Sequence, residues 1–337
     1  MILLDSVYIN ESGGLILLKY LIAEIEKQNL DVYYLCDSRT NCIFSNFEES
    51  KIKFIQNSNI ERIKFYYANR NKFSTILCFG NVPPPISLEV PVFVYLHQKL
   101  FIEIPSDFSF KKKLIYKIKQ MVFNFYKKNA DIWLVQSELM RQQFANKYFN
   151  GNMSHTKVMP FYPHLDFFNQ AIFRKKSSFL YVSNAAPHKN HEKLIAAFCN
   201  AFDETQTGVL TITVPKSSVD LCELIDEKNR LNYPIKNVGF IDRNELVNLY
   251  LSHEYLIFPS LAESFGLGLA EAVDAGCKVL VSDLPYAYQV CDPSLTFNPY
   301  TVESIESAII TAITQELPES NKIITNDINQ LISLLLE

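Results

Sequence analysis

The chain carries the sequence FPSLAESFGLGLAEA at residues 258–272. The apolar run at residues 255–258 leads into it and predicts a buried parallel strand. Small and apolar residues continue to Gly276 and predict a helix that the glycine stops. The stretch therefore predicts a strand, a loop and a helix N-terminus. Free backbone N–H groups and the positive end of the helix dipole favour an anionic ligand at such a place.

Two glutamates stand at either end of this turn. Glu263 precedes the predicted helix, and Glu271 lies about one turn inside it. Eight helical residues span about 12 Å, whereas the paired carboxylates of a retaining glycosidase lie about 5 Å apart. The spacing disfavours a glycosidase and suits two residues that hold the ends of one elongated ligand. The alternative is an amphipathic helix with one glutamate in its first turn and the other on its solvent face.

The stretch resembles the Glu-x7-Glu signature of retaining glycosyltransferases of the family 4 type, which have the GT-B fold. The resemblance implies an α/β structure in which two doubly wound Rossmann-like domains face each other across a cleft. It assigns the donor sugar to Glu263 and the nucleotide ribose to Glu271. The turn between them would offer backbone amides to the sugar and the diphosphate, through Ser264, Phe265, Gly266, Leu267 and Gly268.

A second strand-to-helix loop lies about eighty residues upstream. Residues 179–183 predict a strand and residues 184–191 a loop, in which Lys189 can act as a point charge on a phosphate. The resembled family has Gly-Arg-x4-Lys here, with both basic residues on the diphosphate. Lys189 matches the lysine, whereas Asn184 replaces the arginine and removes one positive charge. The alternative for Lys189 is a solvated loop lysine.

Two histidines flank this lysine. His188 and His191 have no cysteine or carboxylate nearby at metal-ligand spacing. We expect them to face solvent or to cap the helix, and we expect no metal site here.

The first half of the chain predicts a doubly wound domain over residues 1–165. A strand at 1–4, a loop and a helix at 15–27 begin it, and Gly13 and Gly14 permit close backbone approach at the start of the helix. His97 ends a buried strand, where open α/β sheets place ligands. In the resembled family the glycine pair faces the donor phosphate and acceptor, and the histidine lines the cleft beside the transferred sugar. A plain turn and an ordinary buried or surface histidine are the alternatives.

Apolar runs between turn residues predict the strands of both domains. In the first domain they lie at 31–35, 52–55, 74–79, 91–95, 131–135 and 156–159; in the second, over residues 166–337, they lie at 178–183, 208–214, 236–239, 254–258, 278–282 and 294–297. The resemblance places the nucleotide base against Phe240 and Ile241. It also implies that the last helix, predicted at 321–336, crosses back to the first domain.

Composition is consistent with a two-domain globular chain. The 337 residues are 48% hydrophobic, which is enough for two cores. The seven cysteines form no CxxC pair, and neither a signal peptide nor an apolar run of about 18 residues is visible. We therefore expect reduced thiols and a cytoplasmic location, with peripheral attachment to the inner face of the cell membrane as a further option.

Charge is distributed unevenly. Residues 1–165 carry 20 Lys and Arg against 14 Asp and Glu, a net +6, whereas residues 166–337 carry 12 against 22, a net −10. Seven lysines lie within Lys111–Lys128, where apolar residues at 114, 115, 118, 122 and 125 follow helical spacing. Two compatible interpretations stay open: the apolar stripe packs into the domain core with the lysines in water, or the helix contacts an anionic membrane surface through its lysine face. Nucleic-acid binding is disfavoured because the chain is acidic overall and has no RNA-binding motif.

The resemblance predicts a hexosyltransferase-like enzyme. It would move a sugar from a nucleotide diphosphate sugar to a glycan or lipid-linked glycan, with retention, in bacterial surface polysaccharide synthesis of the O-antigen, lipopolysaccharide or capsule kind. Glu263, His97 and Lys189 are the expected catalytic residues. No Asp-x-Asp motif occurs, so neither a metal nor a cofactor is expected.

Three other classes of protein remain as alternatives. One is a glycan-binding or subunit protein of the same fold without catalysis, which the change at Asn184 favours. Another is a nucleotide-sugar epimerase, for which no further acid or base is identified. A dehydrogenase is disfavoured because Gly266 and Gly268 supply only part of the dinucleotide fingerprint.

Overall fold

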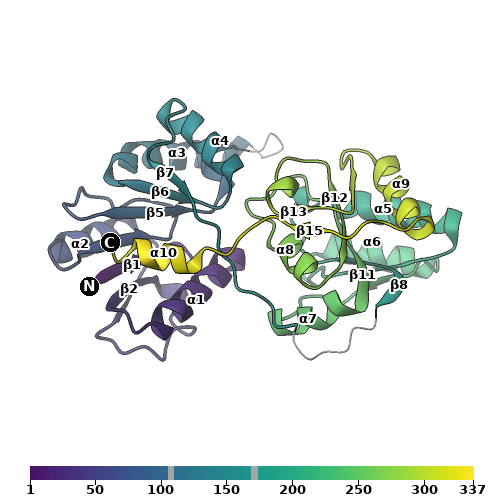
Figure 1. Ribbon diagram of the computed structural model, residues 1–337, viewed down its shortest axis with the longest axis horizontal. Coiled ribbons are helices and arrows are strands. Elements are labelled where there is room, and N and C mark those ends of the chain that lie inside the picture. Colours follow the sequence, from purple (N-terminus) through teal and green to yellow (C-terminus); the bar gives the residue numbers. More distant parts are fainter. Residues whose placement is uncertain (105–109, 168–173) are drawn as a thin grey trace. The chain divides into compact units, whose positions relative to one another are not determined.

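The computed structural model describes residues 1–104, 110–167 and 174–337. The chain forms two compact units (Figure 1): unit 1 is Met1–Pro163 with Thr325–Glu337, and unit 2 is His164–Ile324. The sequence placed the boundary after residue 165, and the resemblance implied that the last helix crosses back to the first domain. The contacts assign the last thirteen residues, Thr325–Glu337, to unit 1.

Unit 1 is built on a parallel sheet of seven strands in the order β3-β2-β1-β4-β5-β6-β7. The strands are β1 (Ile2–Asp5), β2 (Val32–Asp37), β3 (Ile52–Ile55), β4 (Thr75–Cys78), β5 (Val92–Leu96), β6 (Ile132–Val135) and β7 (Thr156–Val158). The helices are α1 (Ser12–Lys27), α2 (Asn59–Asn69), α3 (Phe110–Tyr126), α4 (Glu138–Phe149) and α10 (Ile328–Leu334). Strands β1, β4 and β5 are buried along their whole length, as expected of parallel strands that helices cover on both faces.

Unit 2 repeats this order with a six-stranded parallel sheet, β10-β9-β8-β11-β12-β14. Its strands are β8 (Lys175–Tyr181), β9 (Val209–Ile212), β10 (Ile235–Asn237), β11 (His253–Phe258), β12 (Lys278–Ser282) and β14 (Leu295–Phe297); a short antiparallel pair joins β13 (Cys291–Asp292) to β15 (Asn321–Lys322). The helices are α5 (His191–Thr205), α6 (Val219–Arg230), α7 (Arg243–Ser252), α8 (Leu267–Asp274) and α9 (Val302–Thr314).

Both sheets are doubly wound. In each, the first strand of the unit lies in the middle and the chain runs first to one edge and then to the other. Connections of one hand that run in opposite directions place their helices on opposite faces of the sheet. The strand order reverses between β1 and β4 in unit 1 and between β8 and β11 in unit 2. The predicted α/β class with two doubly wound domains is confirmed.

The end of the chain differs from its prediction. A helix was expected at 321–336, but residues 321–322 form β15 and the helix α10 begins only at Ile328. Asn326 and Asp327 fix the turn before this helix within unit 1, because Asn326 Nδ2 donates to Tyr162 O at 2.9 Å and Asp327 N donates to Pro160 O at 2.8 Å. Figure 1 shows α10 in yellow beside α1.

The basic helix forms as predicted, but one of its two interpretations is wrong. Helix α3 covers Phe110–Tyr126, and its predicted apolar stripe does not pack into the core. All five residues of that stripe are exposed: Leu114, Ile115, Ile118, Val122 and Phe125. Phe123, which lies outside the stripe, is instead the residue that enters the core.

Candidate functional site

The predicted site residues of unit 2 gather where the order of its strands reverses. The loop after β8 carries Asn184 and Lys189, and the loop after β11 carries Glu263. Both loops lie at the carboxyl edge of the sheet on either side of the switch point, because β8 and β11 pair in parallel. Open α/β sheets bind ligands at this place.

An ion pair joins these two loops. Lys189 Nζ lies 2.5 Å from Glu263 Oε1, and the side chains are only 13% and 12% exposed. The ammonium group also lies 5.7 Å from the centre of the Phe258 ring, which ends β11. The alternative of a solvated loop lysine is therefore wrong. Lys189 is held at the carboxyl edge by a carboxylate that comes from 74 residues away in the chain.

Backbone and amide hydrogen bonds hold the two loops together. Leu261 N donates to His188 O at 2.8 Å. The buried Asn190 donates through Nδ2 to Pro259 O at 3.2 Å and to Pro299 O at 2.8 Å. Its backbone is left-handed, with φ of 62°, which asparagine tolerates better than most residues. These contacts fix the register of Lys189 against Glu263.

The turn after Glu263 presents the start of α8. Gly266 is the N-cap with φ of 79°, a conformation that disfavours any residue with a Cβ, and no side chain caps the helix. A Cβ on Gly268 would lie 3.5 Å from Tyr250 Oη and 3.9 Å from Val182 O, so α8 packs closely on the end of β8. Ser264, Phe265 and Leu267 are half-buried in the same turn. The first-turn amides therefore lie at the switch point without a side-chain cap.

Glu271 is buried on α8, so the alternative of a solvent-facing glutamate is wrong. It is 3% exposed, forms an ion pair with Arg243, and accepts a hydrogen bond from Tyr250 Oη at 3.1 Å. Burial raises the pKa of Glu271, and Arg243 and Tyr250 oppose that shift. Arg243 begins α7 directly after the loop that contains Phe240 and Ile241. It therefore connects the predicted base loop to the predicted ribose residue.

The predicted base loop itself is open. Phe240 is 80% exposed and Ile241 is half-buried. The preceding backbone is fixed by Asn237, whose Oδ1 accepts from Gly239 N and from Val214 N, each at 3.0 Å. A large apolar side chain thus stands in solvent at the carboxyl edge of the sheet.

The prediction for His191, the first residue of α5, is wrong. His191 was expected to face solvent or to cap α5, but it is 3% exposed. Its Nε2 lies 3.2 Å from Ser183 Oγ, and its ring packs on Tyr181. Asn184 is exposed, and its Oδ1 accepts from Ala186 N at 3.2 Å, so this side chain shapes its own turn.

The burial of His191 predicts acid sensitivity. Desolvation, with the charge of Lys189, lowers the pKa of His191 from 6.5 to about 4. The unfolded chain therefore binds a proton between pH 6.5 and 4 that the folded chain does not, and stability falls as the pH falls through this window. The loss is about 3 kcal/mol at pH 4, at about 1.4 kcal/mol per pKa unit. Urea unfolding at a series of pH values measures it. His191→Gln should remove about this much of the pH dependence and leave the part that the buried His97 contributes; an unchanged profile in that variant contradicts the assignment.

His97 in unit 1 is held by the loop after β4. Asn81 Oδ1 accepts from His97 N at 2.8 Å and from Gln98 N at 3.0 Å. The imidazole stacks on Phe79, and its Nε2 lies 3.2 Å from both Asn81 Nδ2 and Phe79 O. Burial lowers the pKa of His97 to about 4, so the ring is neutral at pH 7. A neutral ring in a fixed position can serve as a hydrogen-bond partner for a ligand hydroxyl.

Gly14 and His97 lie against each other. A Cβ on Gly14 would come within 3.0 Å of His97 Cε1, whereas a Cβ on Gly13 would meet open space. The structure therefore brings two of the predicted site residues of unit 1 together at the carboxyl edge of its sheet. Gly13 is exposed at the start of α1.

Gly14→Ala should separate activity from stability. The added methyl group must displace the imidazole by a few tenths of an ångström, and we expect kcat/KM to fall about tenfold. Alanine also favours a helix over glycine by about 1 kcal/mol, so the melting temperature should stay level or rise. Steady-state kinetics and thermal unfolding of the same preparation test this. Full activity in the variant would show that the position of His97 does not matter.

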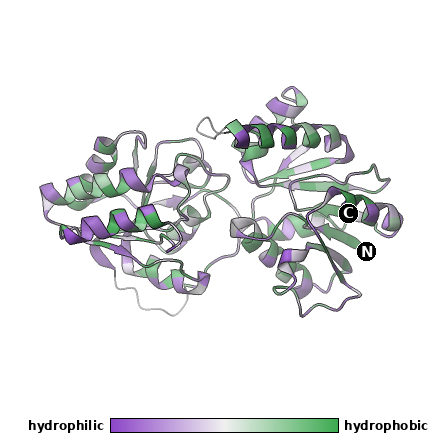
Figure 2. Ribbon diagram, turned by 180° about the vertical axis from the view of Figure 1, so that it is seen from behind, coloured by the Kyte–Doolittle hydropathy of each residue, from purple (hydrophilic) through white to green (hydrophobic). Residues whose placement is uncertain are grey.

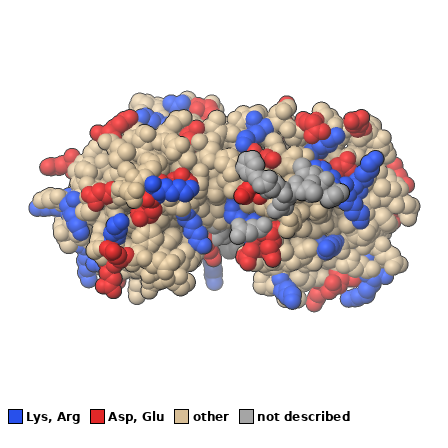
Figure 3. Space-filling model, turned by 60° about the horizontal axis from the view of Figure 1, so that its bottom comes forward, with Lys and Arg blue, Asp and Glu red and all other residues tan. Residues whose placement is uncertain are grey.

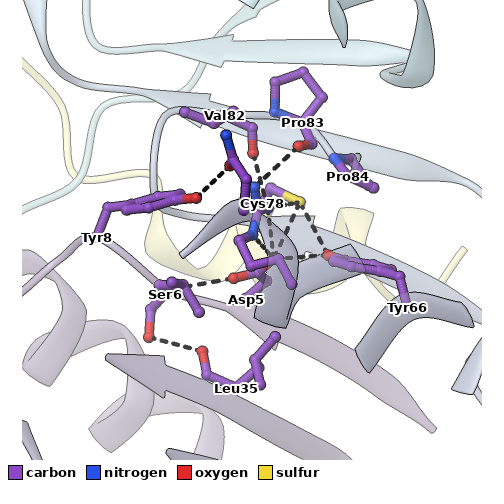
Figure 4. Close-up of polar contacts among 12 residues, drawn as sticks. Asp5, Ser6, Tyr8, Leu35, Tyr66, Cys78, Val82, Pro83 and Pro84 are labelled. Carbon is purple, nitrogen blue, oxygen red and sulfur yellow. Dashed lines mark hydrogen bonds and ion pairs between the residues drawn. The ribbon is translucent and has the colours of Figure 1, made fainter. Parts of the chain in front are cut away.

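A buried ion pair supports the loop that positions His97. Asp5, at the end of β1, accepts from Arg62 Nη2 and from Tyr66 Oη, both at 2.7 Å. Arg62 is 2% exposed and also donates to Val82 O at 3.2 Å and to Pro83 O at 3.3 Å. Figure 4 shows Asp5, Tyr66 and Cys78 converging with these carbonyl groups. We call Asp5, Arg62 and Tyr66 the Asp5 cluster; it ties α2 and β1 to the loop that follows Asn81.

Comparison with known proteins agrees with this geometry. Residues 164–330 match the family described as Glycosyl transferases group 1. The serotype-specific mannosyltransferase WbdA of Escherichia coli is 34% identical over 110 residues, which is 32% of this chain and 14% of that protein. The O-antigen chain mannosyltransferase RfbU of Salmonella typhimurium is 32% identical over 142 residues, which is 40% of this chain and 38% of that protein. The chain thus spans much less than two thirds of these relatives.

The solved structure of HepE from Anabaena, in complex with UDP and glucose, superposes on nearly the whole chain. The TM-score is 0.65 at 15% identity, and the match covers 93% of this chain and 89% of HepE. The chain has the GT-B fold. At this level of identity the likeness concerns the architecture alone, and it agrees with the strand order of both units.

Four residues of this GT-B chain that support the site were not found from the sequence. They are Asn81, Asn190, Arg243 and Tyr250. The signal for the two asparagines was their place in the loops that follow β4 and β8. Arg243 and Tyr250 left no signal, because a helical arginine and tyrosine are ordinary surface and core residues.

The charged surface, the cysteines, the helix lengths and the potential metal ligands add four observations. On the face drawn in Figure 3, acidic and basic side chains are interspersed, unlike the continuous basic surface typical of nucleic-acid binding. All seven cysteines are free. Among residues 1–104, 110–167 and 174–337, no helix is long and apolar enough to span a membrane, and no three His, Cys, Asp or Glu side chains are grouped as metal ligands.

Proposed function

We propose that the chain is a retaining glycosyltransferase of the family 4 type. It would move a hexose from a nucleotide diphosphate sugar to a glycan or a lipid-linked glycan. The observation that carries this proposal is the pairing of Lys189 with Glu263 beside the uncapped start of α8, at the switch point of unit 2. This segment also lies within the residues that match the glycosyltransferase family.

Each residue of unit 2 has a role in this proposal. Lys189 and the amides of Gly266 and Gly268 stabilise the negative charge that develops on the departing diphosphate, which is electrostatic catalysis. Glu263 binds hydroxyl groups of the donor sugar, and Glu271 binds the ribose. Because Lys189 and Glu263 already contact each other, the cation is in place before the donor binds.

The nucleotide side of the proposed site contains a cation that the family pattern does not require. Arg243 pairs with Glu271 and directly follows the loop of Phe240 and Ile241, which we assign to the base. Asn184 stands where the family has a second diphosphate-binding arginine. We propose that Arg243 supplies positive charge to the nucleotide and so compensates in part for Asn184.

Unit 1 supplies the sugar and acceptor side of the reaction in this proposal. We assign Gly13 and Gly14 to close backbone approach and His97 to a sugar hydroxyl. The acceptor hydroxyl attacks the face from which the nucleotide leaves, and no protein nucleophile is required. We further propose that transfer needs neither a metal nor a cofactor, so that rates with EDTA and with added Mg²⁺ should be equal.

Mannose is the first sugar to test, because WbdA and RfbU are named mannosyltransferases. A glucose donor is the second to test, because the structure of HepE was solved with UDP and glucose. The names of both mannosyltransferases also support a role in the synthesis of a bacterial surface polysaccharide. A cytoplasmic location, on the side where nucleotide sugars are made, is part of the same proposal.

Thermal unfolding with a panel of UDP-, GDP-, ADP- and CMP-sugars tests donor binding. A ligand of the folded state at 100 times its Kd adds about 2.7 kcal/mol of stability. We expect one nucleotide class to raise the melting temperature, and the rise to be lost in Glu271→Gln. The matched control is Glu254→Gln, at the amino end of β11 and away from the proposed site, which should keep the rise. No rise with any donor would contradict the proposed site.

A non-catalytic glycan-binding protein is the second candidate. The loss of one cation at Asn184 is the observation that favours it. Such a protein would bind glycan without consuming any donor. Release of nucleoside diphosphate from the stabilising donor, in the presence of acceptor, distinguishes the two.

A further inference from the structure

The outward face of α3 is apolar although it is not covered by the rest of unit 1. Phe110 is 81% exposed, Met121 71% and Phe125 67%. Leu114, Ile115, Ile118 and Val122 are exposed on the same helix. Figure 2 shows hydrophobic and hydrophilic residues together along α3, the helix that adjoins the grey trace of residues 105–109. Exposed apolar patches of this kind mark interaction surfaces.

The opposite face of α3 holds the helix on unit 1. Phe123 is 1% exposed, and its ring packs against Trp133, Phe101 and Tyr148 with centroid distances of 4.9, 5.2 and 4.8 Å. Gln120 Nε2 donates to Leu100 O at 3.0 Å. The helix is therefore fixed in orientation, and its exposed apolar side chains do not result from a loose segment.

Two lysines of α3 border the apolar face. At about 100° per residue, the seven exposed apolar residues fall within an arc of about 140°. Lys117 and Lys119 lie on opposite borders of this arc, Lys111 in the first turn falls within it, and all three are exposed. The helix contains five lysines and no acidic residue, and Lys127 and Lys128 follow directly. An apolar stripe between cationic borders complements the boundary between anionic headgroups and acyl chains.

We propose that α3 docks unit 1 on an anionic lipid bilayer. The helix lies in the plane of the interface, with Phe110, Met121 and Phe125 among the acyl chains and Lys117 and Lys119 at the level of the lipid phosphates. With 17 residues and five lysines it lies on the membrane and does not cross it. A second copy of the chain is the poorer occupant, because pairing two such helices would bring their lysines together without a compensating carboxylate. This proposal does not depend on the proposed reaction.

Co-sedimentation of the full chain with vesicles tests the proposal. The vesicles are phosphatidylcholine alone and phosphatidylcholine with 30% phosphatidylglycerol. We expect binding to the anionic vesicles to be at least tenfold tighter than to the neutral ones, and to weaken as salt is raised. Met121→Asp with Phe125→Asp should lower it at least tenfold. Lys117→Gln with Lys119→Gln should weaken the preference for anionic lipid about tenfold, because each lysine near the surface contributes about 1 kcal/mol.

Ile60→Asp is the matched control. Ile60 is 64% exposed on α2, so the same change of an apolar residue to aspartate is made elsewhere on unit 1. It should leave vesicle binding unchanged, and thermal unfolding should show all variants to be folded. Equal binding to both vesicle types, no binding, or an equal loss in Ile60→Asp would overturn the proposal. A dimer in sedimentation velocity that Phe125→Asp dissociates would instead identify a second copy as the occupant.

Discussion

Replacing Lys189 by methionine should lower kcat for glycosyl transfer by a factor of about 100 to 1000. Methionine keeps an unbranched apolar side chain but removes the ammonium group that lies 2.5 Å from Glu263. Loss of one preorganised group that stabilises transition-state charge costs a factor of this size. The readout is the initial rate of nucleoside diphosphate release at saturating donor. Lys176→Met is the matched control, because Lys176 is exposed at the amino end of the same strand, β8.

A double variant separates chemistry from structure at this pair. Lys189→Met alone leaves Glu263 with little solvent and no cation, which also costs stability. In Lys189→Met with Glu263→Gln the uncompensated charge is gone, so the unfolding free energy should recover while the rate stays low. Recovery of the rate together with the stability would show that the pair is structural only.

Replacing Arg62 by methionine should lower the free energy of unfolding by about 3–5 kcal/mol. The change leaves Asp5 as a buried carboxylate without its cation, and removing one partner of a buried ion pair costs this much. Val82 O and Pro83 O lose their donor as well. Urea unfolding measures the loss. Arg70→Met, an exposed arginine just after the same helix, should change stability by less than about 0.5 kcal/mol.

A double variant that also replaces Asp5 tests whether the unpaired charge causes this loss of stability. Arg62→Met with Asp5→Leu removes both charges, and we expect most of the lost stability to return. If the double variant is as unstable as the single one, the cost lies in the lost hydrogen bonds, those of Arg62 to the loop carbonyls and those of Tyr66 and Val7 to Asp5, and not in the charge of Asp5. The Asp5 cluster also positions the loop of Asn81, so kcat should fall in both variants.

The course of the strands could be predicted from the sequence because parallel strands buried on both faces are continuous apolar runs. Residues 278–282 and 52–55 match β12 and β3 at both ends. The last helix was placed too early because residues 321–327 contain two adjacent isoleucines that fit a helical pattern. Asn326 and Asp327 instead donate hydrogen bonds to the carbonyl groups of Tyr162 and Pro160, and the helix begins only after them.

The site was predictable where a motif names its residues and not where tertiary contacts create it. Lys189 and Glu263 were assigned from two separate loops, but their ion pair depends on the parallel pairing of β8 with β11. The burial of His191 was missed because the sequence around a histidine beside a loop lysine does not show whether the imidazole packs into the core or faces solvent. The orientation of α3 was left open for the same reason, since an amphipathic pattern does not state which face meets the protein.

The proton NMR signal of the transferred sugar's anomeric centre tests the central claim most directly. The donor found in the thermal panel is incubated with lipid-linked glycans extracted from bacteria, and the new glycosidic linkage of the product, which does not mutarotate, is examined. We predict a product with the anomeric configuration of the donor, formed by the wild-type protein and at least 100 times more slowly by Lys189→Met. An inverted product, or a bound donor that is never transferred, would contradict a retaining glycosyltransferase.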